Sequence, residues 1–141
     1  MLRYLTIDYL RKEIQDRFPS DNEIEQDQFF SDDEILHAMQ QAANAYNGMA
    51  PIGIDRVTAL SLPAVGTNAF VDAVVSYLYR QAIHKLRRNL ITWNTGDTSV
   101  DIEKTRLAAF KEAADEMDKL WRQEAMERKI DINRRQAWAY M

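Results

Sequence analysis

Residues 70–78 read FVDAVVSYL, a stretch that is apolar on nearly every side when it is wound into a helix. A helix without a polar face is expected at the centre of a fold, because each of its sides must be shielded from water. We therefore predict a buried central helix from about Thr67 to Ile91. Its second half, by contrast, becomes basic.

A long partner for this helix is predicted at residues 101–128. Apolar residues recur there at alternating steps of three and four: Leu107, Phe110, Ala114, Met117 and Trp121. This spacing forms a seam for antiparallel packing on a neighbouring helix. Across a turn at residues 93–97, the seam is expected to share one core with four residues of the central helix: Val71, Val74, Val75 and Leu78.

A short amphipathic helix is predicted near the start of the chain. Thr6 is expected to be its N-cap, with Asp8 in the first turn favouring the helix dipole. One apolar face follows at helical spacing: Ile7, Leu10, Ile14 and Phe18. Pro19 then ends the helix, because proline cannot continue the backbone hydrogen bonds.

A second helix is predicted at about residues 32–46. It begins with Ser31-Asp32-Asp33-Glu34, a capping box in which Ser31 and Glu34 each accept a hydrogen bond from the other's backbone amide. Its end is predicted at Asn47-Gly48, where a left-handed residue would satisfy the last carbonyl groups.

Residues 47–66 form a long connection rich in glycine and proline. The segment 54–62 partly alternates, which is compatible with a short strand or an irregular loop. Loops of this length are often functional, because binding surfaces need exposed backbone. Together these elements predict a mainly α fold: a helical bundle of about four helices with a long central loop, which occupies residues 1–128.

Beyond residue 128 the apolar pattern changes to period two. Ile130 and Ile132 alternate, and so do Trp138 and Tyr140, which suits an extended conformation. We predict an extended C-terminal arm at residues 129–141. Exposed Trp and Tyr are typical anchors, and the residues predicted to bind a partner are Arg134, Arg135, Trp138 and Tyr140. The alternative is a tail folded onto its own domain.

Composition limits the classes of protein open to this chain. Its 141 residues carry a formal net charge of −4 and no cysteine, with 46% hydrophobic residues. These values fit one globular domain, and the acidic balance argues against a general binder of duplex DNA. No apolar stretch approaches the ~18 residues that a membrane helix needs. We expect a soluble protein, made in a cytoplasm, without disulfides or thiolate metal sites.

Charge is segregated along the chain. Residues 19–36 contain seven acids and no base, whereas residues 79–90 contain four bases and no acid. Opposite patches on different elements suit self-complementary assembly. The residues predicted for a subunit interface are Asp21, Glu23, Glu25, Asp27, Arg80, Arg87 and Arg88. The alternative is a set of solvated charged faces.

No catalytic, cofactor or metal site is predicted. Glu34-x-x-His37 has the spacing found in di-iron helices, but no second pair exists because Gln81 precedes His84 at that offset. The acids of residues 21–27 alternate like calcium ligands, yet the glycine and glutamate positions of a calcium loop hold other residues. Nucleophile and phosphate-loop motifs are also missing. We therefore expect a protein that is not an enzyme.

The basic end of the central helix allows a rival function. Arg87-Arg88 followed by Trp93 is compatible with a nucleic-acid patch that carries an aromatic platform. The rival is thus a helical DNA-binding or regulatory module that uses Arg80, Lys85, Arg87 and Arg88. The structural alternative is a basic helix end that interacts with the helix dipole.

The motif Asp32-Asp33-Glu34-Ile35-x-x-Ala38 continues to Tyr46-Asn47 and is followed by the step Leu62-Pro63 before the two long helices. With the aromatic, basic tail, this layout resembles the small helical head-to-tail connector (adaptor) proteins of tailed bacteriophages. The likeness spans most of the chain.

That resemblance implies a structural virion protein in the neck of the particle, assembled in the host cytoplasm. It implies a ring, commonly of twelve subunits, between the portal protein and a tail-side or stopper protein. DNA would pass through the ring without sequence readout, and the C-terminal arm would contact the portal. The resemblance implies no enzyme activity, no cofactor and no membrane contact.

Overall fold

The computed structural model describes residues 3–14, 30–92 and 98–139 of the chain. In these ranges the backbone is mainly helical and contains no strand, which confirms the predicted mainly α bundle. The elements are α1 (Ile7–Glu13), α2 (Asp32–Asn47), a short 3-10 helix η1 (Ala59–Ser61), α3 (Ala69–Thr92) and α4 (Thr98–Ala139).

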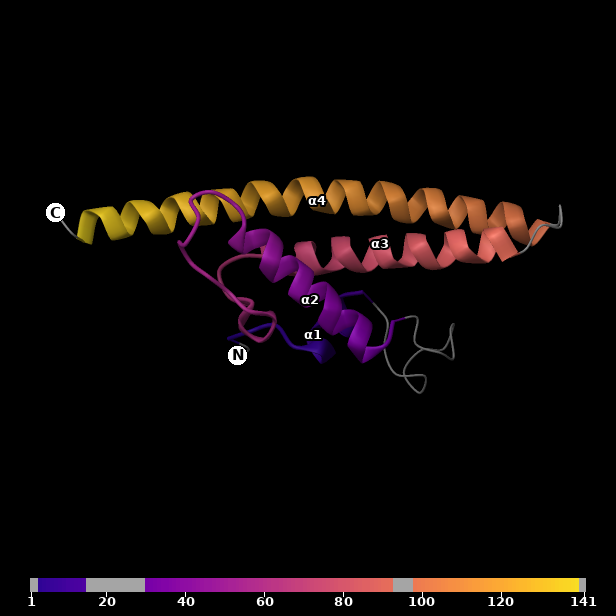
Figure 1. Ribbon diagram of the computed structural model, residues 1–141, viewed down its shortest axis with the longest axis horizontal. Helices are drawn as coiled ribbons and strands as arrows, with labels where there is room; N and C mark the ends of the chain where they lie inside the picture. Colours follow the sequence, from indigo (N-terminus) through magenta and orange to yellow (C-terminus); the bar gives the residue numbers. More distant parts are fainter. Residues whose placement is uncertain (1–2, 15–29, 93–97, 140–141) are drawn as a thin grey trace.

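The two long helices form an antiparallel pair along the length of the molecule (Figure 1). α4 has 42 residues and α3 has 24, so α4 continues past the start of α3 toward the C-terminus. α2 lies obliquely against α3, on the side away from α4, and α1 lies next to α2 together with the N-terminal segment (Figure 1). The core therefore lies between α2, α3 and the inner face of α4.

The predicted starts of the two short helices are confirmed. Thr6 Oγ1 accepts a hydrogen bond from the Tyr9 amide at 3.2 Å. At α2, the Glu34 amide donates to Ser31 Oγ at 3.2 Å, and the Ser31 amide donates to Glu34 Oε1 at 3.4 Å. Each bond satisfies an amide that has no partner within its helix, so local sequence alone fixes these two helix starts.

The predicted left-handed end of α2 is wrong. Gly48 has φ −80°, and its amide simply continues the helical pattern by donating to the Asn44 carbonyl at 3.0 Å. Left-handed residues instead lie further along the loop, at Gly53 (φ 87°), Asp55 (φ 53°) and Gly66 (φ 84°). The left-handed residues therefore lie on both sides of η1, with Gly53 and Asp55 before it and Gly66 after it.

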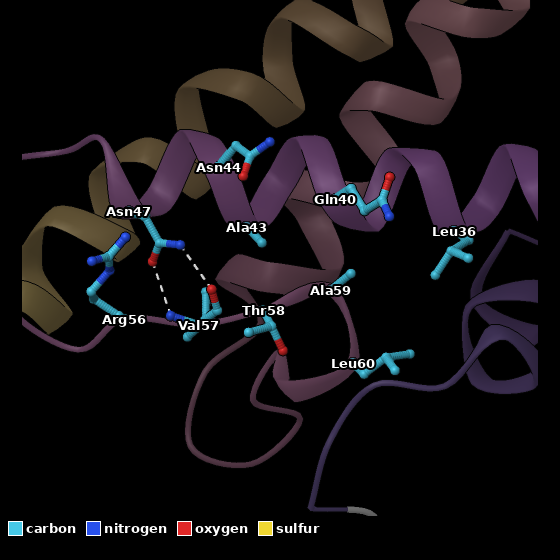
Figure 2. Close-up of a pocket in the computed structure, with 10 residues that line it drawn as sticks. All are labelled: Leu36, Gln40, Ala43, Asn44, Asn47, Arg56, Val57, Thr58, Ala59 and Leu60. Carbon is cyan, nitrogen blue, oxygen red and sulfur yellow. Dashed lines mark hydrogen bonds between the residues drawn. The ribbon is translucent and has the colours of Figure 1, made fainter.

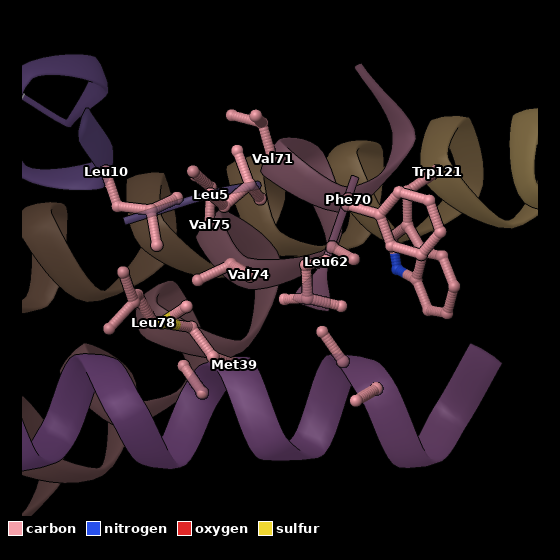
Figure 3. Close-up of a cluster of buried hydrophobic side chains, with 14 of the residues drawn as sticks. Leu5, Leu10, Met39, Leu62, Phe70, Val71, Val74, Val75, Leu78 and Trp121 are labelled. Carbon is pink, nitrogen blue, oxygen red and sulfur yellow. The ribbon is translucent and has the colours of Figure 1, made fainter. Parts of the chain in front are cut away.

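The core is built around α3, as the FVDAVVSYL segment predicts. Phe70, Val74 and Leu78 are at most 1% exposed, and Trp121 of α4 belongs to the same buried cluster (Figure 3). Ser76 is also buried, and its hydroxyl donates to the Ala114 carbonyl of α4 at 3.2 Å. This bond removes the cost of burying a polar group at the helix contact.

The seam predicted for α4 faces α3. Ala114 and Trp121 are each 1% exposed, while Leu107 and Met117 are half-buried. Phe110 is also half-buried, with its ring centroid 5.5 Å from that of Tyr79. The seam thus becomes more deeply buried toward its C-terminal end.

The central loop contains no strand in its described residues, although segment 54–62 allowed one. It is irregular apart from η1, and the N-terminal segment fixes its far end. The Leu5 amide donates to the Leu62 carbonyl at 2.8 Å, and the Ala64 amide donates to the Arg3 carbonyl at 3.1 Å. These bonds attach the loop to the start of the chain.

The predicted extended conformation of residues 129–141 is wrong for the described part, because α4 continues to Ala139. No glycine or proline interrupts the chain after residue 128, so nothing stops the helix. The buried residues Trp121, Ala125 and Lys129 follow one another at steps of four, which carries the seam past the predicted boundary. The alternation of Ile130 with Ile132 does not reflect an extended chain, since both residues lie in α4 and Ile130 is exposed to solvent.

We expect Trp121→Ala to lower the free energy of unfolding by about 3–5 kcal/mol, because the side chain is fully buried in the core cluster. Phe110→Ala should cost less, about 2 kcal/mol, since its ring is only half-buried. Urea unfolding monitored by circular dichroism measures both. Leu120→Ala on the exposed face of α4 is the control, and equal losses in all three variants would contradict this core.

Candidate interaction surfaces

The last turns of α4 project from the domain. Every side chain from Asn133 to Trp138 is exposed, and Trp138 reaches 72% exposure. Arg135 pairs with Asp131 at 2.8 Å, but both side chains are largely exposed, so this pair adds little stability. Three of the four residues predicted to bind a partner thus share one free helical end: Arg134, Arg135 and Trp138. Tyr140 lies outside the described residues.

A buried polar cluster holds the base of this projecting end. Lys129 is 0% exposed, its Nζ donates to the Met49 carbonyl at 2.7 Å, and the same atom lies 4.6 Å from the centre of the Tyr46 ring. Burial lowers the pKa of the Lys129 amine, because a charged group loses its hydration there. The carbonyl and the ring face replace part of that hydration.

Asp55 completes the cluster from the central loop. Its Oδ2 accepts hydrogen bonds from the Tyr46 hydroxyl at 2.6 Å and from Arg128 Nε at 2.8 Å. Burial and the adjacent Asp55 carboxylate both raise the pKa of Tyr46, which keeps its hydroxyl a donor. We call this cluster the Asp55 clamp; its members are Tyr46, Met49, Asp55, Arg128 and Lys129. It ties α4 to α2 and to the loop.

The sequence interpretation missed the Asp55 clamp. One signal was available, because Lys129 continues the spacing of four that begins at Trp121. Lysine is rarely buried, so this spacing alone predicts that the apolar seam of α4 ends before Lys129. Nothing local marks Asp55, whose partners lie 9 and 73 residues away along the chain.

The segregated charges are partly neutralised within the chain. Arg80 pairs with Asp118 of α4 at 3.5 Å. Lys85 forms an ion pair with Glu34, at the capped start of α2, and Arg11 pairs with Asp32 at 2.6 Å. The basic stretch of α3 therefore meets part of the acidic stretch in the same molecule.

The remaining residues of the predicted subunit interface are distributed as follows. Arg87 and Arg88 are exposed on the second half of α3. Asp21, Glu23, Glu25 and Asp27 lie outside the described residues. Among the predicted interface residues that the structure describes, Arg87 and Arg88 therefore lie at the surface, whereas Arg80 forms an ion pair with Asp118 of the same chain.

A groove of about 770 Å³ lies between α2 and residues 56–60 (Figure 2). Leu36, Gln40 and Ala43 of α2 face Leu60, which is 74% exposed. The Asn47 side chain closes one end, since it donates to the Val57 carbonyl at 2.8 Å and accepts from the Val57 amide at 2.9 Å. Its lining is equally divided between apolar residues and polar ones, among them Gln40, Asn44 and Arg56.

The described part of the chain contains no group of three or more side chains suited to hold a metal ion, and His37 is exposed there. None of the described helices is both long and apolar enough to cross a membrane. Comparison of the sequence and structure with protein-family models, curated proteins and solved structures finds no match.

We expect the pair of Asp55 and Arg128 to be coupled energetically. Both side chains are mostly buried, at 21% and 27% exposure, so solvent screens their interaction only in part. A double-mutant cycle with Asp55→Asn and Arg128→Met should give a coupling energy of about 1–2 kcal/mol. Asparagine tolerates the left-handed backbone at this position, so the substitution mainly removes the charge.

The control for this cycle is the exposed pair of Arg135 and Asp131. The same kind of cycle, with Arg135→Met and Asp131→Asn, should show coupling within experimental error. Urea unfolding gives the free energies in both cases. Equal coupling in the buried and exposed pairs would show that the Asp55 clamp does not hold α4.

The stability supplied by Glu34 should disappear in acid. Burial alone would raise the pKa of Glu34, but the hydrogen bond and charge of Lys85, together with the Ser31 bonds, lower it below its ordinary value of 4.5. The folded state therefore favours the carboxylate. Its contribution is complete above pH 4.5 and is lost as the pH falls through the lowered value.

The test compares the melting temperature of the wild type with that of Glu34→Gln between pH 7 and pH 3. Glutamine preserves the capping box, so the difference reports the charge interaction with Lys85. We expect the wild type to be more stable at pH 7, with the difference vanishing toward pH 3. Glu112→Gln on the exposed side of α4 is the control, and a difference for Glu34→Gln that is independent of pH would refute the interaction.

Proposed function

We propose that the protein is a structural virion component, a head-to-tail adaptor that forms a ring between the portal and the tail of a phage particle. The observation that carries this proposal is the exposed end of α4, where Trp138, Arg134 and Arg135 project from a folded helical domain. An exposed tryptophan beside basic groups is a typical anchor for a partner protein.

The helical state of this end favours tight docking. Ordering a flexible arm costs about 1–2 kcal/mol per residue in backbone freedom. Residues 133–139 are already helical, and the Asp55 clamp fixes the turn before them. Less ordering is needed on binding, so more of the energy from burying Trp138 can appear as affinity for the portal-like partner.

The charge of the chain is compatible with a ring around passing DNA. A net charge of −4 limits nonspecific attachment to phosphates, which a channel must avoid. The rival DNA-binding function is less well supported, because Arg80 and Lys85 are engaged by Asp118 and Glu34. Salt-dependent binding of duplex DNA by the isolated protein would favour the rival.

Deleting residues 134–141 should leave the domain folded and abolish docking to the portal-like partner. The deleted described side chains are exposed, whereas deletion from residue 128 onward would also remove Arg128 and Lys129 and should destabilise the fold. Circular dichroism melting tests folding, and co-sedimentation with tail-less, portal-bearing capsids tests docking.

Within the same assay, Trp138→Ala should weaken docking by about 30-fold or more, which corresponds to about 2 kcal/mol. Gln136→Ala, an exposed neighbour on the same helical end, is the matched control and should dock as the wild type does. Normal docking of the truncated chain would remove the end of α4 as the anchor.

A further inference from the structure

The sequence contains a single Asn-Gly pair, Asn47-Gly48, and it lies at the end of α2. The fold does not require glycine there. Gly48 has φ −80° and ψ −10°, which other residues adopt readily, and a Cβ atom at this position would lie 3.4 Å from the Asn44 carbonyl oxygen and 3.7 Å from that of Ala45. Both are van der Waals distances, so alanine fits. The consequence of having glycine at residue 48 is therefore chemical rather than conformational.

Asparagine followed by glycine is prone to deamidation, because no Cβ atom hinders the attack on the side chain. The backbone nitrogen of Gly48 attacks Cγ of Asn47. A bond forms between these two atoms, the Cγ–Nδ2 bond breaks, and ammonia leaves with the proton of the Gly48 amide. Water then opens the resulting succinimide ring at either carbonyl, which gives an aspartyl or an isoaspartyl residue at position 47. The reaction needs no other reactant.

Three hydrogen bonds oppose this reaction in the folded protein. Asn47 Nδ2 donates to the Val57 carbonyl at 2.8 Å, and Asn47 Oδ1 accepts from the Val57 amide at 2.9 Å (Figure 2). The Gly48 amide donates to the Asn44 carbonyl at 3.0 Å. The attacking nitrogen thus keeps its proton, and the side-chain amide is held on Val57. Because Asn47 is only half-buried and Gly48 is exposed, these bonds protect the pair, and exclusion of water does not.

We propose that Asn47-Gly48 is a latent deamidation site, protected while the end of α2 is hydrogen-bonded and reactive when that end opens. Helix ends open more readily than the core, since fewer contacts hold them. Deamidation converts such a transient opening into a permanent chemical change. The proposal is independent of the ring and of the portal contact.

Deamidation also releases the loop from α2. A carboxylate at position 47 has no N–H to donate, so the Val57 carbonyl loses its partner and meets a negatively charged group. Position 47 is the last residue of α2, where the helix dipole disfavours negative charge. An isoaspartyl residue in addition lengthens the backbone and shortens the side chain. The pair of bonds to Val57 therefore cannot re-form.

The protection is tested by incubating the wild-type protein in native buffer and in guanidinium chloride at the same pH and temperature. Peptide mass spectrometry measures the rate of deamidation at each asparagine. We expect Asn47 to react at least about tenfold more slowly in the folded protein than in the unfolded chain. Asn44 and Asn133 are internal controls, because each is followed by a residue with a Cβ atom. In guanidinium chloride both should react more slowly than Asn47.

Gly48→Ala is the matched variant, because alanine fits the backbone at this position. It should fold as the wild type does and slow the reaction of Asn47 in guanidinium chloride by about tenfold or more. Asn47→Asp reproduces one of the products and should unfold at a lower guanidinium chloride concentration than the wild type, whereas Gly48→Ala should not. If Asn47→Asp does not fold, wild-type protein that is partly deamidated in denaturant, refolded and separated by ion exchange gives the same comparison.

Three results would contradict the proposal. Equal rates at Asn47 in the folded and unfolded chains would show that the bonds to Val57 and Asn44 give no protection. A rate at Asn47 in denaturant no faster than that at Asn44 would remove the site altogether. An unchanged unfolding midpoint of the deamidated chain would show that the reaction does not release the loop.

Discussion

Trp121 of α4 is buried in one cluster with Phe70 of α3 and Tyr46 of α2, and the rest of the structure depends on the packing of this cluster. Figure 3 shows Trp121 and Phe70 within it, and Tyr46 packs against Phe70 with ring centroids 4.8 Å apart. The burial of Trp121 fixes which face of α4 packs on the domain. Residues before Trp121 therefore face α3, while Ala125 and Lys129 after it face the end of α2 and the loop.

The Asp55 clamp extends the same register into polar chemistry. A buried lysine is costly unless its donors find acceptors, and Lys129 has the Met49 carbonyl and the face of Tyr46. Asp55 is linked to Arg128 of α4, and Val57, two residues later, is linked to Asn47 of α2. The segment from Asp55 to Val57 is thus hydrogen-bonded to α4 at one end and to α2 at the other. Arg56 and Val57 also line the groove beside α2, so the packing of α4 influences the shape of this groove.

α4 carries two functions on one helix. Its inner face is apolar and supports the domain, whereas its last turns expose Arg134, Arg135 and Trp138. Because both belong to a single rigid helix, the exposed end keeps a fixed distance from the core. On our proposal, that distance sets how far the portal contact lies from the folded domain.

The sequence by itself determined which segments form the main helices and where α1 and α2 begin, because those features depend on local interactions. The N-cap at Thr6 and the capping box at Ser31 act within three residues, and the apolar runs of α3 and of the seam from Leu107 to Trp121 define their own buried faces. The tertiary structure alone decided the burial of Lys129. It follows from contacts with Met49 and Tyr46, about 80 residues away along the chain. A period of two or of 3.6 in a short polar segment cannot reveal such partners, since a buried charge is stabilised only by groups that folding brings to it.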